Sequence, residues 1–447
     1  MDLPGRAARA ARTARLLSLP LGTAALAVAG LGRRVRGEDA EAVRRDLRAR
    51  NAARTRRVLG EAKGGALKAG QLLSTVEALM PADPEDTWRQ ALTALQEDAG
   101  GLPFAEVEPL LRAELGPGWR SAYRRFEEEP VAAASLGQVH RAVRGDGREV
   151  AVKVQYPGVR EALAGDLRAV SAVTRVAGLV APGLALPPLV AEMRDRLVEE
   201  LDYVHEADAQ ARFAAAYADD PRVVVPAVVE ATPRVLVADW LDGTPLARVA
   251  TTGTQAERDE AAALYQYALV SGPERAGLLH TDPHPGNVRV LPPAAPGGPA
   301  RVGLLDFGST LPMPGGMPPT FGRLIRVLLA RDEAGVLAGL RAEGFVRPGS
   351  RVDARKLSDY LAPFSEPARH EEFRFSRAWL RGQFGRLGDP RDPDFAVALQ
   401  LTLPAEHLFT HRVWLGMVGV LCQLEATVPV RPVLARWLPG FAPDPPA

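Results

Sequence analysis

The stretch PVAAASLGQVHRAVRGDGREVAVKVQYPG, at residues 130–158, limits the possible folds of this chain more than any other feature. Short apolar and β-branched runs lie on either side of RGDGRE, in which Asp146-Gly147 is a strong hairpin-turn signal. We expect three strands here, with residues 150–155 as the third. Because most of the surrounding sequence has helical patterning, these strands predict a small sheet within an α+β protein.

Helical and β patterns alternate along the rest of the chain. Helical spacing of apolar residues predicts helices within residues 39–80, 84–115, 159–217, 255–271 and from 319 onward, with a break at 182–188. The segment RVVVPAVVEATPRVLVADWLDG predicts a strand, a turn and a second strand, and VRVL and RVGLLD predict two more strands. The order is typical of a small sheet followed by a mainly helical part.

Length and composition exclude several classes of protein. With 447 residues, 47% of them hydrophobic and 24% charged, the chain can bury a full core and is long enough for two lobes. Its net charge of +1 gives no overall basic field, so we expect no nucleic-acid partner. The single cysteine, Cys422, lies in an apolar run, which predicts a buried core thiol, excludes an internal disulfide and suits a reducing cytoplasm.

The amino terminus combines basic and apolar residues without matching a membrane span. Arginines recur at every third position from Arg6 to Arg15, residues 16–31 are mostly apolar, and Arg33-Arg34 follows. A spanning helix needs about 20 apolar residues, whereas this stretch is shorter and contains Pro20. The doubled arginine also argues against a secretory signal. Two interpretations stay open: a helix lying on an anionic membrane surface, and an ordinary solvated helix.

Lys153 is a charged residue inside VAVKV, the predicted third strand. If this strand is buried, the lysine points inward, at a cost of several kcal/mol unless something compensates its charge. A phosphate and a partner carboxylate would compensate it, as in protein kinases, where a third-strand lysine holds the α and β phosphates. The alternative is an edge-strand lysine whose ammonium reaches water.

The segments HTDPHPGN and LLDFGS carry the polar residues that such a site needs. Asp282 and Asn287 have the spacing of the aspartate and asparagine in the kinase catalytic loop, and His280 stands two residues before the aspartate. Asp306, followed by Phe307-Gly308, comes after an apolar run. Mg²⁺ prefers hard oxygen ligands, so Asn287 and Asp306 can hold the metal, while Asp282 can accept or orient an attacking hydroxyl.

Two departures from the kinase pattern are equally informative. Where kinases have a glycine-rich phosphate loop, this chain has Ala132-Ala133-Ala134-Ser135. Alanine resists positive φ and keeps a Cβ near the phosphates, so we expect an altered nucleotide position and restrained phosphoryl transfer. After Gly308, STLPMPGGMPP leads almost directly into a helical pattern, without an A-P-E segment. The missing activation segment argues against a conventional protein substrate.

These motifs together resemble the UbiB/AarF atypical kinase-like family, which is linked to isoprenoid-quinone and lipid metabolism. The resemblance spans residues 60–310; only Thr281 departs mildly, from a small Gly or Ala. It is carried by KAGQ at 68–71, AAAS at 132–135, VAVKVQYPG around Lys153, EELDYVHEA at 199–207, HTDPHPGN and LLDFGS.

The resemblance implies a role for each matched residue. Lys68 and Gln71 share a face of a predicted helix, and Glu200 points away from the face that Asp202 and Glu206 share. The implied roles are Lys153 with Glu206 as a salt bridge at the catalytic site, Asp282 as catalytic residue, Asn287 and Asp306 as metal ligands, Ala132, Ala133, Ala134, Ser135 and Lys153 at the nucleotide, and Lys68, Gln71, Glu200 and Asp202 as the family's distinguishing site.

The resemblance also implies a fold and an activity. We expect an α+β, two-lobed protein-kinase-like fold with an N-terminal helical extension and extra C-terminal helices. The expected domains are a basic/apolar segment at 1–37, the extension with the K-x-G-Q motif at 38–120, an N-lobe at 121–242 and a C-lobe at 243–447. The expected function is that of an ATP- and Mg²⁺-dependent kinase or ATPase acting on, or regulated by, a small lipid-like molecule of an isoprenoid or quinone pathway. The expected location is cytoplasmic, with peripheral membrane contact left open.

Two alternatives remain from the sequence. A nucleotide-sensing pseudokinase scaffold fits the alanines in the phosphate loop, which favour binding over transfer. A small-molecule phosphotransferase of the aminoglycoside or choline kinase type shares the H-x-D-x-x-x-x-N spacing, but we expect neither the K-x-G-Q segment nor the alanine loop in it. The last 130 or so residues carry no motif that we can assign.

Overall fold

A computed structural model describes residues 101–134, 136–161, 198–347, 349–387, 397–398 and 400–442 of the chain. The chain divides into two compact units, an N-terminal unit at Met1–Asp195 and a C-terminal unit at Arg196–Ala447. The predicted helix at 39–80, the basic amino terminus, Lys68, Gln71 and Ser135 lie outside the described residues.

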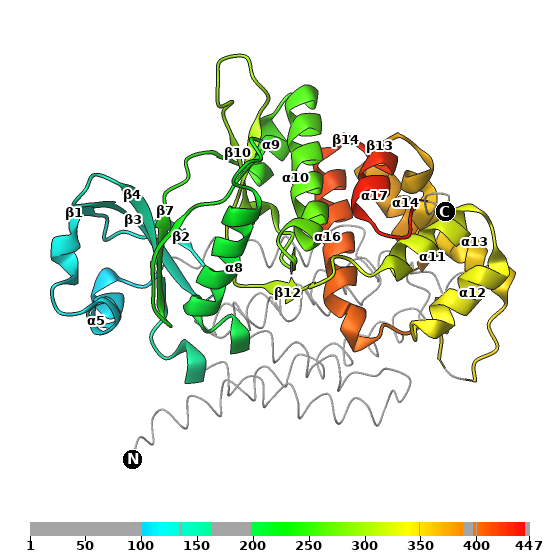
Figure 1. Cartoon of the computed structure of the whole chain (residues 1–447), viewed down its shortest axis with the longest axis horizontal. Helices are drawn as coiled ribbons and strands as arrows, with labels where there is room; N and C mark the ends of the chain where they lie inside the picture. The colour runs from blue at the N-terminus through cyan, green and yellow to red at the C-terminus, as the bar shows by residue number, and fades with distance from the viewer. Residues whose placement is uncertain are drawn as a thin grey trace, which may run out of the picture. The chain divides into compact units, whose positions relative to one another are not determined.

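The N-terminal unit has a small antiparallel sheet, and the three predicted strands are confirmed (Figure 1). β3 pairs with β4 across the predicted turn, where Gly147 has a φ of +92° and the Arg148 N–H donates to Asp146 Oδ1 at 2.9 Å. β1 and β2 both pair with β3. The elements are α5 (Phe104–Leu115), η1 (Trp119–Ala122), β1 (Tyr123–Phe126), β2 (Ala132–Ala133), β3 (Gly137–Arg144) and β4 (Glu149–Gln155).

Buried polar groups fix the start of α5 against β3. Gln138 is fully buried; its Oε1 accepts from the Leu102 N–H at 2.7 Å and its Nε2 donates to the Leu102 carbonyl at 3.1 Å. His140 is fully buried too, bonded to Gln138 and to the Glu127 carbonyl, and burial lowers the pKa of its imidazole. A satisfied, neutral histidine stabilises this core without a charge.

The C-terminal unit contains the remaining strands and most of the helices. Its strands are β5 (Val223–Val224), β6 (Val228–Ala231), β7 (Val235–Asp239), β8 (Thr244–Pro245), β9 (Leu278–His280), β10 (Val288–Leu291), β11 (Arg301–Leu304), β12 (Thr310–Pro312), β13 (Glu372–Arg374) and β14 (Thr427–Pro429). Its helices are α8 (Tyr203–Ala216), α9 (Leu246–Thr252), α10 (Gln255–Arg275), η2 (Pro285–Asn287), α11 (Pro319–Leu329), α12 (Glu333–Ala342), α13 (Ala354–Ser365), η3 (Glu366–Arg369), α14 (Arg377–Leu387), η4 (Ala405–His407), α16 (Leu408–Leu424) and α17 (Arg431–Trp437).

One strand prediction in this unit is wrong in detail. The single strand expected after residue 222 is divided into β5 and β6, with Pro226 between them, because proline cannot donate a ladder hydrogen bond. β5 pairs in parallel with β11, in the order β5-β11-β10-β8, whereas β6 pairs antiparallel with β7. The strands predicted from VRVL and RVGLLD are confirmed as β10 and β11.

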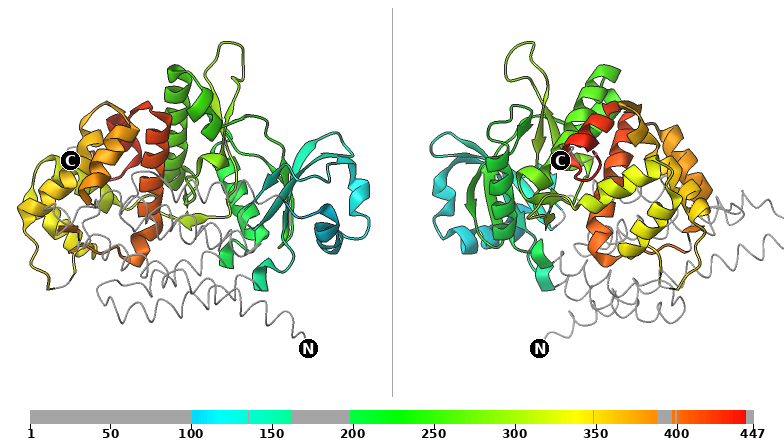
Figure 2. Two further views of the ribbon diagram at one scale, coloured as in Figure 1. Left: turned by 180° about the vertical axis from the view of Figure 1, so that it is seen from behind. Right: turned by 45° about the vertical axis from the view of Figure 1, so that its right-hand side comes forward.

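Helix α10 is the central element of this unit, beside α16 and α17 (Figure 1). It begins at a capping box: Thr254 Oγ1 accepts from the Glu257 N–H at 3.3 Å, and the Glu257 carboxylate accepts from the Thr254 N–H at 2.7 Å. Helices α11, α12 and α13 pack on one another around a second apolar core that includes Val336 and Leu357 (Figure 2).

A buried ionic cluster surrounds Asp220 at the base of α10. Its carboxylate accepts two hydrogen bonds from the Arg222 side chain, at 2.9 Å each, and one from the Tyr267 hydroxyl, and it lies 3.6 Å from Arg275. Arg222 also stacks over the Tyr267 ring at 3.9 Å. Burial raises the pKa of Asp220, but the hydrogen bonds from Arg222 and Tyr267 outweigh burial and hold this pKa well below its usual value.

The predicted core thiol is confirmed. Cys422 is fully buried in α16, and burial raises the pKa of its thiol to about 12. Within the described residues, none of the helices combines the length and apolar character that crossing a membrane requires.

Candidate active site

The segment from His280 to Asn287 forms a loop whose two ends are bonded to the chain around Asp306. The Thr281 N–H donates to the Ser309 carbonyl at 3.0 Å, and the Leu305 N–H donates to the Asn287 carbonyl at 2.8 Å. β9 pairs with β12 and β10 with β11, so antiparallel pairing continues these contacts on both sides. The two motifs that the sequence predicted to converge therefore do lie together in the C-terminal unit.

Asp282 is held by one side-chain hydrogen bond on each carboxylate oxygen. Asn287 Nδ2 donates to Oδ2 at 2.7 Å, and Arg412 Nη2 donates to Oδ1 at 3.2 Å. The Asp282 side chain is still 27% exposed. Because a carboxylate has about four acceptor positions, these two bonds orient Asp282 and leave it able to accept an O–H. This arrangement suits a group that receives or orients the proton of an attacking hydroxyl.

The next residue, Pro283, is clamped between two helices. The Tyr265 hydroxyl on α10 donates to the Pro283 carbonyl at 2.6 Å. On α16, Gly416 packs so closely that a Cβ there would lie 2.4 Å from Pro283 Cγ. Burial, with a smaller contribution from the charge of Asp282, raises the pKa of Tyr265 well above its usual value, so this hydroxyl stays a donor. The clamp fixes the backbone beside Asp282.

Asp306 has an unusual backbone conformation. Its φ is +58°, in the left-handed region, and the Gly308 N–H donates to its Oδ1 at 3.3 Å. A non-glycine residue pays about 1–2 kcal/mol for this conformation, and such strain is concentrated at functional sites. The conformation, rather than helix or strand pairing, sets the direction of the Asp306 carboxylate.

Helix α8 packs against the segment after Asp306 at two points. The Phe307 ring centroid lies 5.0 Å from that of Phe213 and 5.5 Å from that of His280. Two turns closer to the start of α8, on the same face as Phe213, Glu206 is 2% exposed, and a Cβ on Gly308 would lie 3.3 Å from its Oε2. Glu206, the carboxylate predicted to pair with Lys153, is thus buried beside the Asp306-Phe307-Gly308 motif.

In the N-terminal unit, the alanine segment forms a strand rather than an open loop. Ala132 and Ala133 make up β2, and the Ala134 N–H donates to the Gly137 carbonyl at 2.8 Å, which closes a tight turn. A Cβ on Gly137 would lie 2.0 Å from the Val154 carbonyl oxygen. The close approach of β3 and β4 therefore requires a glycine at position 137.

Lys153 lies on β4, as predicted, but not on its most buried face. Val150, Val152 and Val154 are fully buried, while Lys153 alternates with them and lies on the opposite, partly buried face. Alternation on a buried strand predicted that Lys153 points inward. The structure instead places it on the partly buried face of β4. Lys153 and Glu206 belong to different units, and their salt bridge stays a prediction.

Of the two acidic residues predicted before α8, Asp202 has a structural role. Asp202 is the N-cap of α8, and its Oδ1 accepts from the Val204 N–H at 3.0 Å, while Glu200 is partly buried in the preceding turn. Their partners in the predicted family site, Lys68 and Gln71, lie outside the described residues, as does Ser135. The assignment of these five residues stays a prediction.

The oxygen atoms of Asn287 and Asp306 fit Mg²⁺ better than a metal ion whose ligands all come from the protein. Within the described residues there is no group of three or more His, Cys, Asp or Glu side chains that could enclose a metal. Asn287 uses its amide nitrogen on Asp282, so its amide oxygen is the atom it can offer, and Asp306 adds a carboxylate. Mg²⁺ is commonly bound by one or two such oxygens together with phosphates and water.

Sequence reasoning missed three residues of this site: Arg412, Tyr265 and Phe213. Tyr265 and Phe213 follow the apolar spacing of helices, which gives no reason to separate them from ordinary core residues. Arg412 is one of 55 basic residues and lies 130 residues beyond Asp282. Tertiary packing alone brings it to the loop, and no local pattern carries that information.

Comparison with known proteins agrees with this geometry. The ABC1 atypical kinase-like domain matches residues 94–339. The "Atypical kinase coq-8, mitochondrial" of Caenorhabditis elegans is 30% identical over 85% of this chain and 49% of its own length. The "Atypical kinase COQ8, mitochondrial" of Saccharomyces cerevisiae is 30% identical over 61% of this chain and 53% of its own. The chain thus spans about half the length of these curated relatives.

A solved structure is similar over most of the chain. Rv3197 of Mycobacterium tuberculosis, solved as a complex with erythromycin, is 38% identical, has a TM-score of 0.67, and is matched over 91% of this chain and 100% of its own. The predicted α+β, kinase-like fold class is therefore confirmed.

Proposed function

We propose that this chain, which belongs to the ABC1 atypical kinase-like family, binds ATP with Mg²⁺ and either hydrolyses it in response to a small lipid-like molecule or transfers phosphate to such a molecule. The observation that carries the proposal is the convergence of Asp282, Asn287 and Asp306 in one unit, through the hydrogen bonds of Thr281 and Leu305.

In this proposal each residue has a defined role, and Asn287 has two. Asn287 and Asp306 would hold Mg²⁺, which neutralises the phosphates when bound. Asp282, oriented by Asn287, accepts the proton of the attacking hydroxyl or water. Lys153 would compensate the phosphate charge, and the buried Glu206 would orient the lysine. Catalysis of this kind consists mainly of positioning and electrostatic stabilisation.

A small molecule fits the acceptor side better than a protein. From Gly308 the chain passes through β12 and reaches α11 at Pro319, so the segment that docks a peptide in protein kinases is very short. The lipid-like character of the acceptor or effector rests on the resemblance to the UbiB/AarF proteins. A cytoplasmic location is suggested by the single cysteine, and peripheral membrane contact by the arginine-rich and apolar amino terminus. Co-flotation with anionic but not neutral liposomes tests that contact.

The test of catalysis compares ATP turnover by the wild type and by Asp282→Asn. We expect a loss of turnover of about 10³-fold or more, because the carboxylate that accepts the proton is removed while its shape is kept. Equal rates would favour the nucleotide-sensing scaffold instead.

The test of the metal role is Asp306→Asn, measured by nucleotide binding with and without Mg²⁺. Asparagine tolerates the left-handed backbone at this position, so the change removes charge without adding strain. We expect Mg²⁺-dependent binding to be lost. Retained Mg²⁺ dependence would contradict the assignment of Asp306.

A second candidate function, binding of a macrolide, is favoured by the erythromycin complex of the Mycobacterium tuberculosis relative. Titration of the full chain with erythromycin, followed by calorimetry, tests it. Saturable binding that also changes ATP turnover would join the two candidates, with the macrolide in the place of the proposed lipid-like effector. Absence of binding would remove the macrolide candidate only.

A further inference from the structure

The catalytic loop carries no cation of its own. Its sequence from His280 to Asn287 contains no lysine or arginine. His284 is turned back onto the loop, where its Nδ1 accepts from the Gly286 N–H at 3.0 Å. The positive charge beside Asp282 comes instead from Arg412 on α16, at 3.2 Å. This ion pair joins the loop to the C-terminal region in which the sequence shows no motif.

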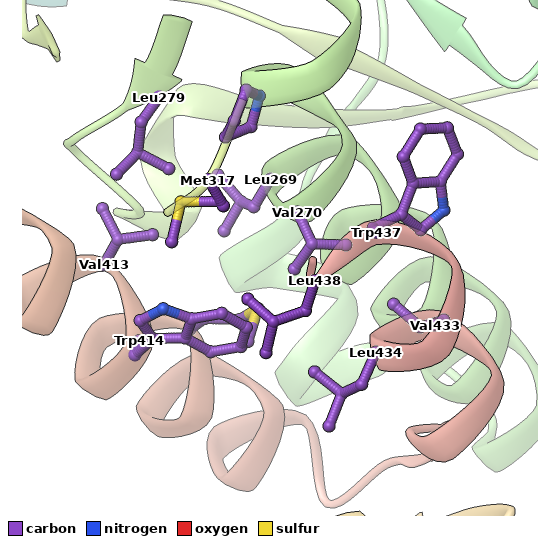
Figure 3. A pocket seen from close by; sticks show the side chains of 12 residues that line it. Leu269, Val270, Leu279, Met317, Val413, Trp414, Val433, Leu434, Trp437 and Leu438 are labelled. Atoms are coloured by element: carbon purple, nitrogen blue, oxygen red, sulfur yellow. The ribbon is translucent and has the colours of Figure 1, made fainter. Parts of the chain in front are cut away.

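Helix α16 is held rigidly where it meets the loop. Val413, Trp414 and Met417 face an apolar seam formed with α10 and α17, whose side chains converge in Figure 3. The remaining cavity there has a volume of about 10 Å³, room for about one water molecule, so the seam is packed rather than open to a ligand. On the loop side, Gly416 packs directly against Pro283, with no room for a Cβ between them.

We propose that Arg412 is a positioning residue for Asp282, an inference that rests on the proposed function. Arg412 and Asn287 each bond one oxygen of the Asp282 carboxylate, so together they fix the plane of the group. Either bond alone would leave the carboxylate free to rotate about the bond to its Cβ. With both, the remaining acceptor positions of Asp282 point in fixed directions for the incoming hydroxyl.

The charge of Arg412 has a second consequence. Asp282 must sit close to a strongly anionic phosphate group, and two negative charges repel one another at short range. The guanidinium offsets the charge of Asp282, and only one of its five N–H groups is used in the bond to Oδ1.

The structure offers a matched control for this assignment. Arg436 on α17 forms a two-bond ion pair with Glu274 on α10, at 2.8 and 2.9 Å. This pair also ties a C-terminal helix to α10, and its geometry is better than that of the Arg412 pair. It does not touch the loop, so it separates an effect on Asp282 from the general loss of a surface ion pair.

The experiment measures ATP turnover by the full chain for Arg412→Gln, Arg412→Lys and Arg436→Gln, each also checked for its melting temperature. We expect Arg412→Gln to lower kcat about 10- to 100-fold, because small misplacement of a reacting group has effects of this size. KM for ATP should change by no more than about twofold, since nucleotide binding does not use Arg412. Arg412→Lys should recover part of kcat, and Arg436→Gln should match the wild type.

The same substitution in the Asp282→Asn background decides whether Arg412 acts through Asp282. In that background Arg412→Gln should cause no further loss of turnover. A wild-type kcat in Arg412→Gln, or an equal loss in both backgrounds, would overturn the role of Arg412 and leave the proposed function intact. A wild-type chain without ATP turnover would overturn the proposed function, and the role of Arg412 with it.

Discussion

Two aspartates of the C-terminal unit are paired with arginine in very different ways. The Asp220 side chain is 3% exposed and accepts bonds from both the backbone and the guanidinium of Arg222, with Tyr267 as a further donor. The Asp282 side chain is 27% exposed and accepts one bond per oxygen. The first carboxylate is saturated with partners, and the second keeps acceptor capacity and access. A paired carboxylate that remains partly open is the one suited to chemistry.

The largest expected effect distinguishes the two aspartates by stability. Asp220→Asn removes a buried charge from its arginines, and we expect a loss of about 3 kcal/mol in the free energy of unfolding. Asp282→Asn should cost less than about 1 kcal/mol, because its ion pair is partly solvated. Urea unfolding of both variants measures the difference. Similar losses would show that the contrast in exposure has no energetic meaning.

The second prediction concerns the packing of α16 on the loop. Gly416→Ala places a Cβ 2.4 Å from Pro283 Cγ, and such overpacking costs about 2 kcal/mol. Turnover should fall as well, since the loop must shift. Gly382→Ala on α14 is the control, because nothing lies within 4 Å of its Cβ position. That change should leave turnover unaltered, and equal behaviour of the two variants would contradict the clamp.

The third prediction compares buried tyrosines near each aspartate. Tyr265→Phe removes the hydroxyl bonded to the Pro283 carbonyl, for which we expect a loss of about 1.5 kcal/mol together with lower turnover. Tyr217→Phe removes a buried hydroxyl bonded to Ser271 near Asp220. It should reduce stability without changing turnover per folded molecule. Turnover lost equally in both variants would indicate a general effect of destabilisation.

The smallest expected effect is the pH dependence of the stability that Asp220 contributes. Because the pKa of Asp220 is held below its unfolded value, its ionised form contributes stability above about pH 4. As the pH falls below that value, this contribution is lost, by about 1 kcal/mol at pH 3. The stability difference between wild type and Asp220→Asn should therefore be constant from pH 5 to 7 and shrink at pH 3. A difference that grows in acid would reverse the assigned direction of the pKa shift.

Local patterns predicted those parts of the molecule that local chemistry determines. The hairpin at Asp146-Gly147 follows from a turn signal that only glycine satisfies, and the structure confirms it with a φ of +92°. The strand after residue 222 is divided at Pro226. The sequence shows this proline, but not that the residues before it form β5 and pair with β11. Strand existence was predictable, and strand partners were not.

The candidate site divides in the same way. That Asp282, Asn287 and Asp306 lie in neighbouring segments was predicted from residue type, order and spacing, and the structure confirms that these segments are bonded to each other. The left-handed backbone of Asp306, the burial of Glu206 beside Gly308 and the contact of Arg412 with Asp282 depend on tertiary packing. No periodicity in the sequence encodes a contact across 130 residues, so these features required the structure.

The distance in sequence between Asp282 and Arg412 sets an order of events during synthesis. Arg412 follows Asp282 by 130 residues. Because the ribosome adds about 5–20 residues per second, the loop emerges about 6 to 26 seconds before this arginine. Until α16 has been made and has docked, a nascent chain contains Asp282 without the arginine that bonds its Oδ1. The loop therefore gains the geometry described above only after α16 has been synthesised, and a chain released before residue 412 would contain HTDPHPGN and LLDFGS yet lack the arginine.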